Sequence, residues 1–309
     1  MKIGSYKPNG KVFLAPMADY ANVAFRKLCF EKGAALTYTE LISAKAINLR
    51  SKKTLKMLDT FDGEQVFLQL FGNDPIEFEK AVEHVEKEFS KRFVGYDLNC
   101  GCAVPKALKG QYGCFLMDYP KLVGEIISAM KKSTSKPITV KIRIGLKKEA
   151  FLAVAREAEK AGVDAICLHA RLGTQHYSGK ADWDKIAELM KAVKVPIIGN
   201  GDIETKEDAE RMFKETKCDF IMVGRGAIGN ASIFKEIETG KERTFEERIK
   251  EAERYIELAE EFGLKINDVR GYFIGMVKGI RGAAEIRNKF ALTKEIPELK
   301  GVLEELKKS

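Results

Sequence analysis

Two cysteines separated by a single residue are the first candidates for chemistry in this sequence. Cys100 and Cys102 lie in the stretch DLNCGCAVPKALKGQYG, residues 97–113, at the end of an apolar run. A structural zinc ion needs four ligands, usually with two to four residues between paired cysteines, and no second pair follows Cys114. A redox dithiol usually has two residues between its cysteines. We therefore favour a single functional thiol and expect no metal.

Cationic and amide side chains recur in other apolar runs. Lys141 and Arg143 lie on one face of a run that is otherwise isoleucine, valine and threonine. A cation directed into a core is costly unless it meets an anion, so an anionic cofactor or intermediate is the simplest partner. Gln69 could both donate to and accept from a flat heterocycle. His169 by itself would be a core histidine, but its position near Arg171 favours a site.

Two glycine-containing turns could bind a phosphate. They are NGD at 200–202 and GRGAIGN at 224–230. Backbone N–H groups at such turns and at helix N-termini bind phosphate, and Arg225 could add a charge-assisted hydrogen bond. Ordinary tight turns are the alternative interpretation.

The elements that would position these residues alternate between strand and helix. Eight short apolar runs are each followed by a turn signal and a helical pattern. The runs are residues 11–17, 35–40, 65–72, 93–101, 137–145, 165–171, 196–202 and 220–226. This pattern predicts an α/β fold, a parallel (β/α)8 TIM barrel. An open doubly wound sheet would carry a glycine-rich fingerprint after its first strand, where this chain has APMAD.

A barrel of this kind has its active site at the carboxyl ends of its strands. The residues at the expected strand ends are therefore predicted to meet at one mouth. They are Pro16, Met17, Ala18, Gln69, Asn99, Cys102, Lys141, Arg143, His169, Arg171, Asn200, Gly201, Asp202, Gly224 and Arg225.

The strand pattern stops near residue 240, and we expect a barrel domain over 1–240 and a small helical domain over 241–309. Apolar spacing predicts helices at 245–262, at about 267–281 and around 297–307. Four cations lie in the middle of this region: Lys278, Arg281, Arg287 and Lys289. They could form a solvated helix face or a basic docking surface.

The composition is ordinary for a globular protein, with 309 residues, 45% hydrophobic and 32% charged. The net charge of +8 suits an anionic partner such as nucleic acid. No apolar run approaches the roughly 18 residues that span a bilayer. Six scattered cysteines do not form a secreted disulfide framework, so we expect a cytoplasmic location. We also expect a monomer with no membrane partner.

Seven motifs, read in order, resemble those of the bacterial tRNA-dihydrouridine synthases. They are APMAD, LQLFG, DLNCGC, VKIRIG, HAR…YSGKADW, GNGD and VGRGAIGN, and EIRNKF at 285–290 resembles a motif of that family's C-terminal helical domain. The resemblance implies an FMN-dependent enzyme that uses NADPH to reduce the C5=C6 bond of selected uridines in tRNA. One departure is Ala103, which stands where the family usually has proline after its catalytic cysteine.

The resemblance also implies a role for each matching residue. Cys102 would be the proton donor, with Asn99 facing the uracil and the flavin, and Arg171 would contact the substrate. The isoalloxazine or ribityl part would contact Pro16, Met17, Ala18, Gln69, Lys141 and His169. The ribityl chain and phosphate would contact Asn200, Gly201, Asp202, Gly224 and Arg225.

The implied mechanism agrees with the chemistry of these side chains. Hydride would pass from the reduced flavin to C6 of the uracil, and an acid would quench the carbanionic character at C5. A free thiol, with a pKa of about 8.5, is protonated at neutral pH and can serve as that acid. Lys141 would stabilise the anionic reduced flavin. A flavin barrel of the dihydroorotate dehydrogenase type and a tRNA-binding module without activity are the alternatives.

Overall fold

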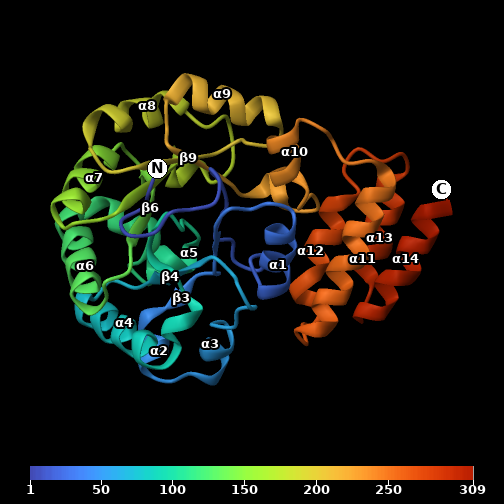
Figure 1. Cartoon of the computed structure of the whole chain (residues 1–309), viewed down its shortest axis with the longest axis horizontal. Helices are drawn as coiled ribbons and strands as arrows, with labels where there is room; N and C mark the ends of the chain where they lie inside the picture. Colours follow the sequence, from blue (N-terminus) through green and yellow to red (C-terminus); the bar gives the residue numbers. More distant parts are fainter. Residues whose placement is uncertain (309) are drawn as a thin grey trace.

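The computed structural model describes residues 1–308 and contains a parallel barrel surrounded by helices (Figure 1). Eight strands follow one another around the barrel in the order β1-β9-β8-β7-β6-β5-β4-β2. Their bounds are β1 Val12–Leu14, β2 Thr37–Tyr38, β4 Val66–Phe71, β5 Gly95–Cys100, β6 Ile138–Gly145, β7 Ala165–Leu172, β8 Ile197–Asn200 and β9 Phe220–Val223. The predicted (β/α)8 barrel is confirmed.

Backbone hydrogen bonds between the segments of β1 and β2 close the barrel. The Leu14 N–H donates to Leu36 O at 2.9 Å, and the Ala35 N–H donates to Val12 O at 3.0 Å. A short extra strand, β3 (Ile42–Ser43), also pairs with β4. The sequence predicted one strand over 35–40, whereas the structure has two short strands in this region.

Helices follow the strands and cover the outside of the barrel. They are α1 Val23–Glu31, α2 Ala44–Asn48, α3 Lys52–Lys56, α4 Pro75–Phe89, α5 Pro105–Lys109, α6 Pro120–Ser133, α7 Phe151–Lys160, α8 Trp183–Ala192, α9 Lys206–Thr216 and α10 Ile233–Thr239. The start of α4 is as predicted: the Asp74 side chain accepts from the Ile76 N–H, and Pro75 occupies the first turn. Gly162, just after α7, has the positive φ of +87° that a helix C′ position favours.

Apolar side chains fill both the barrel interior and the layer between strands and helices. Phe13, Tyr38, Phe67 and Phe220 are buried inside the barrel. Close packing there explains Gly95, because a Cβ atom at this position would lie 2.5 Å from Cζ of Phe67.

The C-terminal region contains four helices, where the sequence predicted three. They are α11 Phe245–Glu261, α12 Ile266–Met276, α13 Ala283–Leu292 and α14 Ile296–Lys308. The chain leaves α12 because Gly279 and Gly282 have φ values of +79° and +74°, which a helix cannot contain. The pattern for α13 was missed because its buried side chains are few, Ile286 and Phe290.

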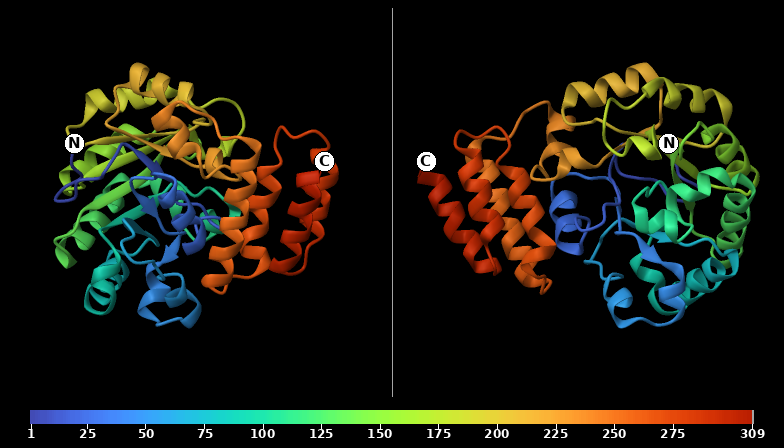
Figure 2. Two further views of the ribbon diagram at one scale, coloured as in Figure 1. Left: turned by 45° about the vertical axis from the view of Figure 1, so that its right-hand side comes forward. Right: turned by 180° about the vertical axis from the view of Figure 1, so that it is seen from behind.

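The helical region lies at one side of the barrel, where α11 packs against α1 (Figures 1 and 2). Phe25 of α1 contacts the rings of Tyr255 and Tyr272. The carboxylate of Glu251, fully buried in α11, accepts from the Ala231 N–H, from Tyr272 Oη and from the guanidinium of Arg243. Both apolar and polar contacts therefore connect the barrel to the helical region. None of the helices in residues 1–308 is long and apolar enough to cross a membrane.

Candidate active site

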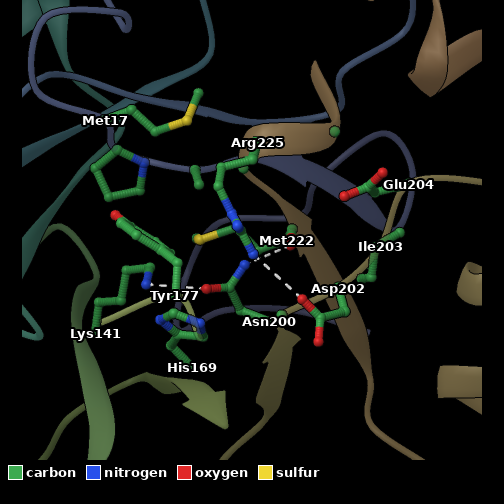
Figure 3. Close-up of a pocket in the computed structure, with 15 residues that line it drawn as sticks. Met17, Lys141, His169, Tyr177, Asn200, Asp202, Ile203, Glu204, Met222 and Arg225 are labelled. Carbon is green, nitrogen blue, oxygen red and sulfur yellow. Dashed lines mark hydrogen bonds and ion pairs between the residues drawn. The ribbon is translucent and has the colours of Figure 1, made fainter. Parts of the chain in front are cut away.

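Most of the predicted strand-end residues line one cavity at the carboxyl ends of the strands (Figure 3). The predicted residues in its wall are Pro16, Met17, Lys141, His169, Asn200, Gly201, Asp202, Gly224 and Arg225. Tyr177, Glu204 and Met222 also line it and had not been assigned to the site. Parallel strands bring together residues more than 200 positions apart in the sequence, as for Pro16 and Arg225.

Lys141 projects from β6 toward the strand-end amide of β8. Its Nζ donates to Oδ1 of Asn200 at 3.1 Å, and Nδ2 of Asn200 donates to Met222 O at 2.7 Å. The Met222 carbonyl thus fixes the Asn200 amide with its oxygen toward the lysine. No carboxylate within residues 1–308 forms an ion pair with Lys141. Burial lowers the pKa of Lys141 and repulsion from Arg143 lowers it further, while attraction to the nearby Asp97 opposes both effects.

Asp202 lies between two arginines at the edge of the cavity. Arg171 Nη2 donates to its two carboxylate oxygens at 2.8 and 2.7 Å, and Arg225 Nη2 lies 3.3 Å from Oδ1. The Ala181 N–H adds a third donor at 2.7 Å. Burial by itself would raise the pKa of Asp202, but these donors hold it below the ordinary value. Asp202 is therefore ionised at neutral pH.

His169 is held neutral at the centre of this cationic wall. Burial lowers its pKa well below the usual value, and the nearby lysine and arginines lower it further. Arg171 Nη1 lies 3.4 Å from His169 Nε2. An arginine can only donate, so this contact fits the tautomer in which Nε2 is bare and Nδ1 carries the proton.

Tyr177 is an aromatic wall of the cavity. Its ring centroid lies 4.6 Å from the Arg225 guanidinium and 5.8 Å from that of Arg143, and the ring is tilted against His169 (Figure 3). The side chain is 58% exposed, so it borders the cavity rather than the core. The motif YSGKADW contained this residue, but no periodicity distinguished it from a loop tyrosine.

Arg143 corrects one expectation from the sequence. An anion was the expected partner of the cations on this strand, but Arg143 is satisfied by carbonyl oxygens. Its Nε donates to Gly101 O at 2.9 Å, and its Nη1 donates to Leu172 O and His176 O. Arg143 therefore fastens the loop after β5 to the loop after β7.

Gln69, Asn99 and Cys102 form a second group, beside the cavity rather than in its wall. Nδ2 of Asn99 donates to Oε1 of Gln69 at 2.8 Å, and the Cys102 N–H donates to Oδ1 of Asn99 at 3.1 Å. Asn99 is the register partner of Lys141, which connects the two groups.

The six cysteines differ in exposure. Cys102 is partly exposed, whereas the other five are buried. Burial raises the pKa of Cys100 well above the usual value, so this thiol is an inert packing residue. Within residues 1–308, no group of three or more histidine, cysteine or acidic side chains could hold a metal ion.

Two further predicted residues lie outside the cavity wall. Ala18 is in the loop after β1 but is not part of the wall. Arg171 is 1% exposed, and its guanidinium also donates to Ser178 O and Gly179 O. The surroundings of Arg171 indicate that it positions Asp202 and the loop after β7.

The four cations predicted in the helical region have different partners. Lys278 forms an ion pair with Glu204 at 2.9 Å, and Lys289 with Glu305 at 2.7 Å. Arg281 and Arg287 are exposed, and neither pairs with an acid in the described part of the chain. These two arginines are the free cations of the set.

Comparisons with known proteins identify the family. A family model described as dihydrouridine synthase matches residues 13–308. The chain belongs to the dihydrouridine synthase family. The predicted family is thereby confirmed, and with it the enzyme class, a flavin-dependent oxidoreductase.

Relatives from several bacteria support the same assignment. A probable tRNA-dihydrouridine synthase of Aquifex aeolicus is 36% identical over 96% of both chains. The tRNA-dihydrouridine synthase B of Pasteurella multocida is 34% identical over 77% of this chain and 72% of its own.

Solved structures share the barrel at low sequence identity. An old yellow enzyme homologue from Zymomonas mobilis has a TM-score of 0.58 at 14% identity, covering 79% of this chain and 92% of its own. Histamine dehydrogenase from Rhizobium sp. 4-9 has a TM-score of 0.61 at 14% identity, covering 89% of this chain and 50% of its own. These similarities concern the fold.

Proposed function

We propose that this member of the family is an FMN-dependent tRNA-dihydrouridine synthase that uses NADPH as reductant. The observation that carries the proposal is the cationic cavity around Lys141, a half-buried lysine that forms no ion pair with a carboxylate in residues 1–308, in a chain that matches the family over residues 13–308. An anionic flavin would supply the missing counter-charge.

The cavity wall suits FMN in two respects. Arg225 and the glycines Gly201 and Gly224 offer a charged donor and close backbone approach at the turns after β8 and β9, where barrels bind phosphate. Lys141 and the neutral His169 would face the isoalloxazine or ribityl part, together with Pro16, Met17, Ala18 and Gln69. Asn200 and Asp202 would join Gly201, Gly224 and Arg225 at the ribityl chain and phosphate.

The bound flavin would supply hydride to C6 of the uracil, and the chain's own residues would do the rest. Cys102, the partly exposed thiol, would deliver a proton to C5. Asn99 would orient the uracil beside Lys141, its register partner. Arg171 would act through Asp202 rather than touch the substrate directly, because its guanidinium is buried and fully engaged.

We further propose that residues 1–240 form the catalytic domain and residues 241–309 the tRNA-binding domain. Arg281 and Arg287 lie exposed without acidic partners and would bind tRNA phosphates. The target base must leave its stack to reach a cavity at the mouth of a barrel.

Recombinant protein tests the proposal directly. We expect it to purify yellow, with an FMN spectrum that NADPH bleaches under anaerobic conditions. Incubation with an unmodified tRNA transcript should then form dihydrouridine, detected by mass spectrometry of nucleosides. A colourless protein would disprove the flavin assignment. A yellow protein that reduces or oxidises a free pyrimidine but leaves tRNA unmodified would favour a flavin barrel of the dihydroorotate dehydrogenase type.

A further inference from the structure

A buried carboxylate inside the barrel connects to the loop that carries Cys102. Asp97 lies on β5 with no exposed surface, as do Thr139 on β6 and Gln69 on β4. Thr139 Oγ1 donates to Asp97 Oδ1 at 2.5 Å, and Gln69 Nε2 donates to Asp97 Oδ2 at 2.6 Å. Asp97 is not part of the cavity wall that carries Lys141 and Arg225.

A chain of hydrogen bonds continues from Asp97 to the backbone of the Cys102 loop. Gln69 uses its Nε2 on Asp97, so its Oε1 faces Asn99 and accepts from Asn99 Nδ2 at 2.8 Å. Oδ1 of Asn99 in turn accepts from the Cys102 N–H at 3.1 Å and faces the Gly101 N–H at 3.4 Å. The chain thus runs through two amides, from a carboxylate to a backbone N–H.

The two ends of this chain require the same orientation of both amides. An ionised carboxylate can only accept, and a backbone N–H can only donate. If the amides of Gln69 and Asn99 were reversed, Gln69 would turn an oxygen toward Asp97, and Asn99 would turn its NH2 toward the Cys102 N–H. Both contacts would be repulsive, so only one orientation satisfies the buried groups.

The loop itself leaves little room for another arrangement. Gly113 has a φ of +65°, and a Cβ atom there would lie 2.5 Å from Cys102 O. The Cys114 N–H donates to that same oxygen at 2.8 Å. Residue 102 is therefore held at its carbonyl by the backbone and at its N–H by Asn99 alone.

We propose that Asp97 is a positioning residue that sets the orientation of the Gln69 and Asn99 amides and so holds the thiol of Cys102 in place. The catalytic meaning of this role rests on the proposed function, whereas the effect on the Cys102 loop does not.

Thiol alkylation measures the loop independently of activity. Cys102 is the partly exposed cysteine and the other five are buried, so native protein should take up one iodoacetamide label, located by peptide mass spectrometry. We compare Asp97→Leu, which keeps a similar shape but cannot accept, with Asp97→Asn. The asparagine can still accept from Gln69 while donating to Thr139, whose hydroxyl already lies 3.4 Å from Tyr96 O.

We expect Asp97→Leu to label Cys102 about tenfold faster than wild type, because one ordering hydrogen bond is lost. Asp97→Asn should stay within about twofold of wild type. Cys100→Ala is the matched control for packing on the same strand and should also leave the rate unchanged. Equal rates for wild type and Asp97→Leu would overturn the proposal, and so would equal acceleration by Asp97→Asn.

A second variant covers loss of folding. More than one label on Asp97→Leu would mean that this variant is partly unfolded. Gln69→Leu then removes the next group in the hydrogen-bond series, the one that contacts Asn99. A wild-type labelling rate of Cys102 in Gln69→Leu would overturn the proposal. With saturating tRNA, Asp97→Leu should also form dihydrouridine about tenfold more slowly than Asp97→Asn. If the wild-type protein forms no dihydrouridine but the variants show the expected labelling rates, the proposed function is wrong and the positioning role of Asp97 is still supported.

Discussion

Arg171 donates from a single nitrogen, Nη2, to both carboxylate oxygens of Asp202, at 2.8 and 2.7 Å. The pair joins the end of β7 to the turn after β8, and Arg171 also holds the loop carbonyls of Ser178 and Gly179. A residue assigned to the substrate on the basis of its motif is thus part of the framework around the cavity.

The first prediction concerns this pair. Arg171→Met should lower the free energy of unfolding by about 3 kcal/mol, because removing one partner leaves a carboxylate and two carbonyls without their donor. Urea unfolding at neutral pH measures the effect. Arg156→Met, on the exposed face of α7, is the control and should change stability by less than about 0.5 kcal/mol. A loss of similar size in both variants would contradict the structural role.

The second prediction concerns cofactor binding. Arg225→Ala should weaken FMN binding by about 10- to 100-fold, since a charge-assisted hydrogen bond contributes roughly 1.5–3 kcal/mol. Lys141→Ala should remove a contact to the ring system and slow reduction of the flavin. Flavin fluorescence titration of apoprotein measures the first effect and anaerobic stopped-flow absorbance the second. Full FMN occupancy and unchanged activity in both variants would mean that the flavin lies elsewhere.

The third prediction distinguishes the two neighbouring cysteines. Cys102→Ala should reduce dihydrouridine formation by about 10²–10⁴-fold, the usual contribution of a positioned acid, while NADPH still reduces the flavin. Cys100→Ala should affect neither half-reaction appreciably, because its side chain is buried in the core. The two half-reactions are assayed separately. Loss of uridine reduction only in Cys100→Ala would show that the wrong thiol was chosen.

The fourth prediction concerns tRNA. Arg281→Ala and Arg287→Ala should each weaken tRNA binding and make the slope of log K against log salt shallower by about one unit or less. Lys278→Ala should have a smaller effect, because Lys278 already pairs with Glu204. Filter binding between low and moderate salt measures both quantities, and equal slopes for all three variants would contradict the assignment.

Point substitutions suit this test better than removal of residues 241–309. Removing that segment would uncover Phe25 and leave the Ala231 N–H and Ser232 hydroxyl without the Glu251 carboxylate. A truncated barrel would then report on folding as well as on tRNA binding.

The fifth prediction concerns pH and Asp97. Burial raises the pKa of Asp97 to about 6, against the opposing hydrogen bonds from Thr139 and Gln69 and the charge of Lys141. The unfolded value is about 3.9, so between these values the folded state binds more protons than the unfolded state. The stabilisation associated with this proton is therefore complete below about pH 4 and is lost as the pH rises through about 6.

Asp97→Asn lacks this titration, whereas all other groups titrate in both proteins. The free energy of unfolding of wild type relative to the variant should therefore rise by roughly 1 kcal/mol when the pH is lowered from about 7 to about 5. Urea unfolding of both proteins at the two pH values measures the difference. A difference that stays constant or shrinks on acidification would contradict the raised pKa.

Residue order alone predicted the alternation of strand and helix, because each buried parallel strand reads as a short apolar run. The N-cap and first turn of α4 and the glycine after α7 were equally local and were predicted correctly. Nine of the predicted site residues share one cavity, since the barrel brings its strand ends to one mouth. The helix α13 was missed because a helix that buries only Ile286 and Phe290 has almost no apolar periodicity.

The partners of the polar side chains were decided by the tertiary structure. A sequence shows that Arg143, Arg171 and Asp97 are charged and lie on strands, but a strand's neighbours in a closed barrel determine which groups face each charge. Arg143 thus bonds carbonyls rather than an anion, and Arg171 bonds Asp202 rather than the solvent. Asp97 bonds Gln69 and Thr139 from the strands on either side of its own. A hydrogen bond requires a donor–acceptor distance of about 3 Å, set to within a few tenths of an ångström. For atoms far apart in the chain, only the packed fold sets that distance.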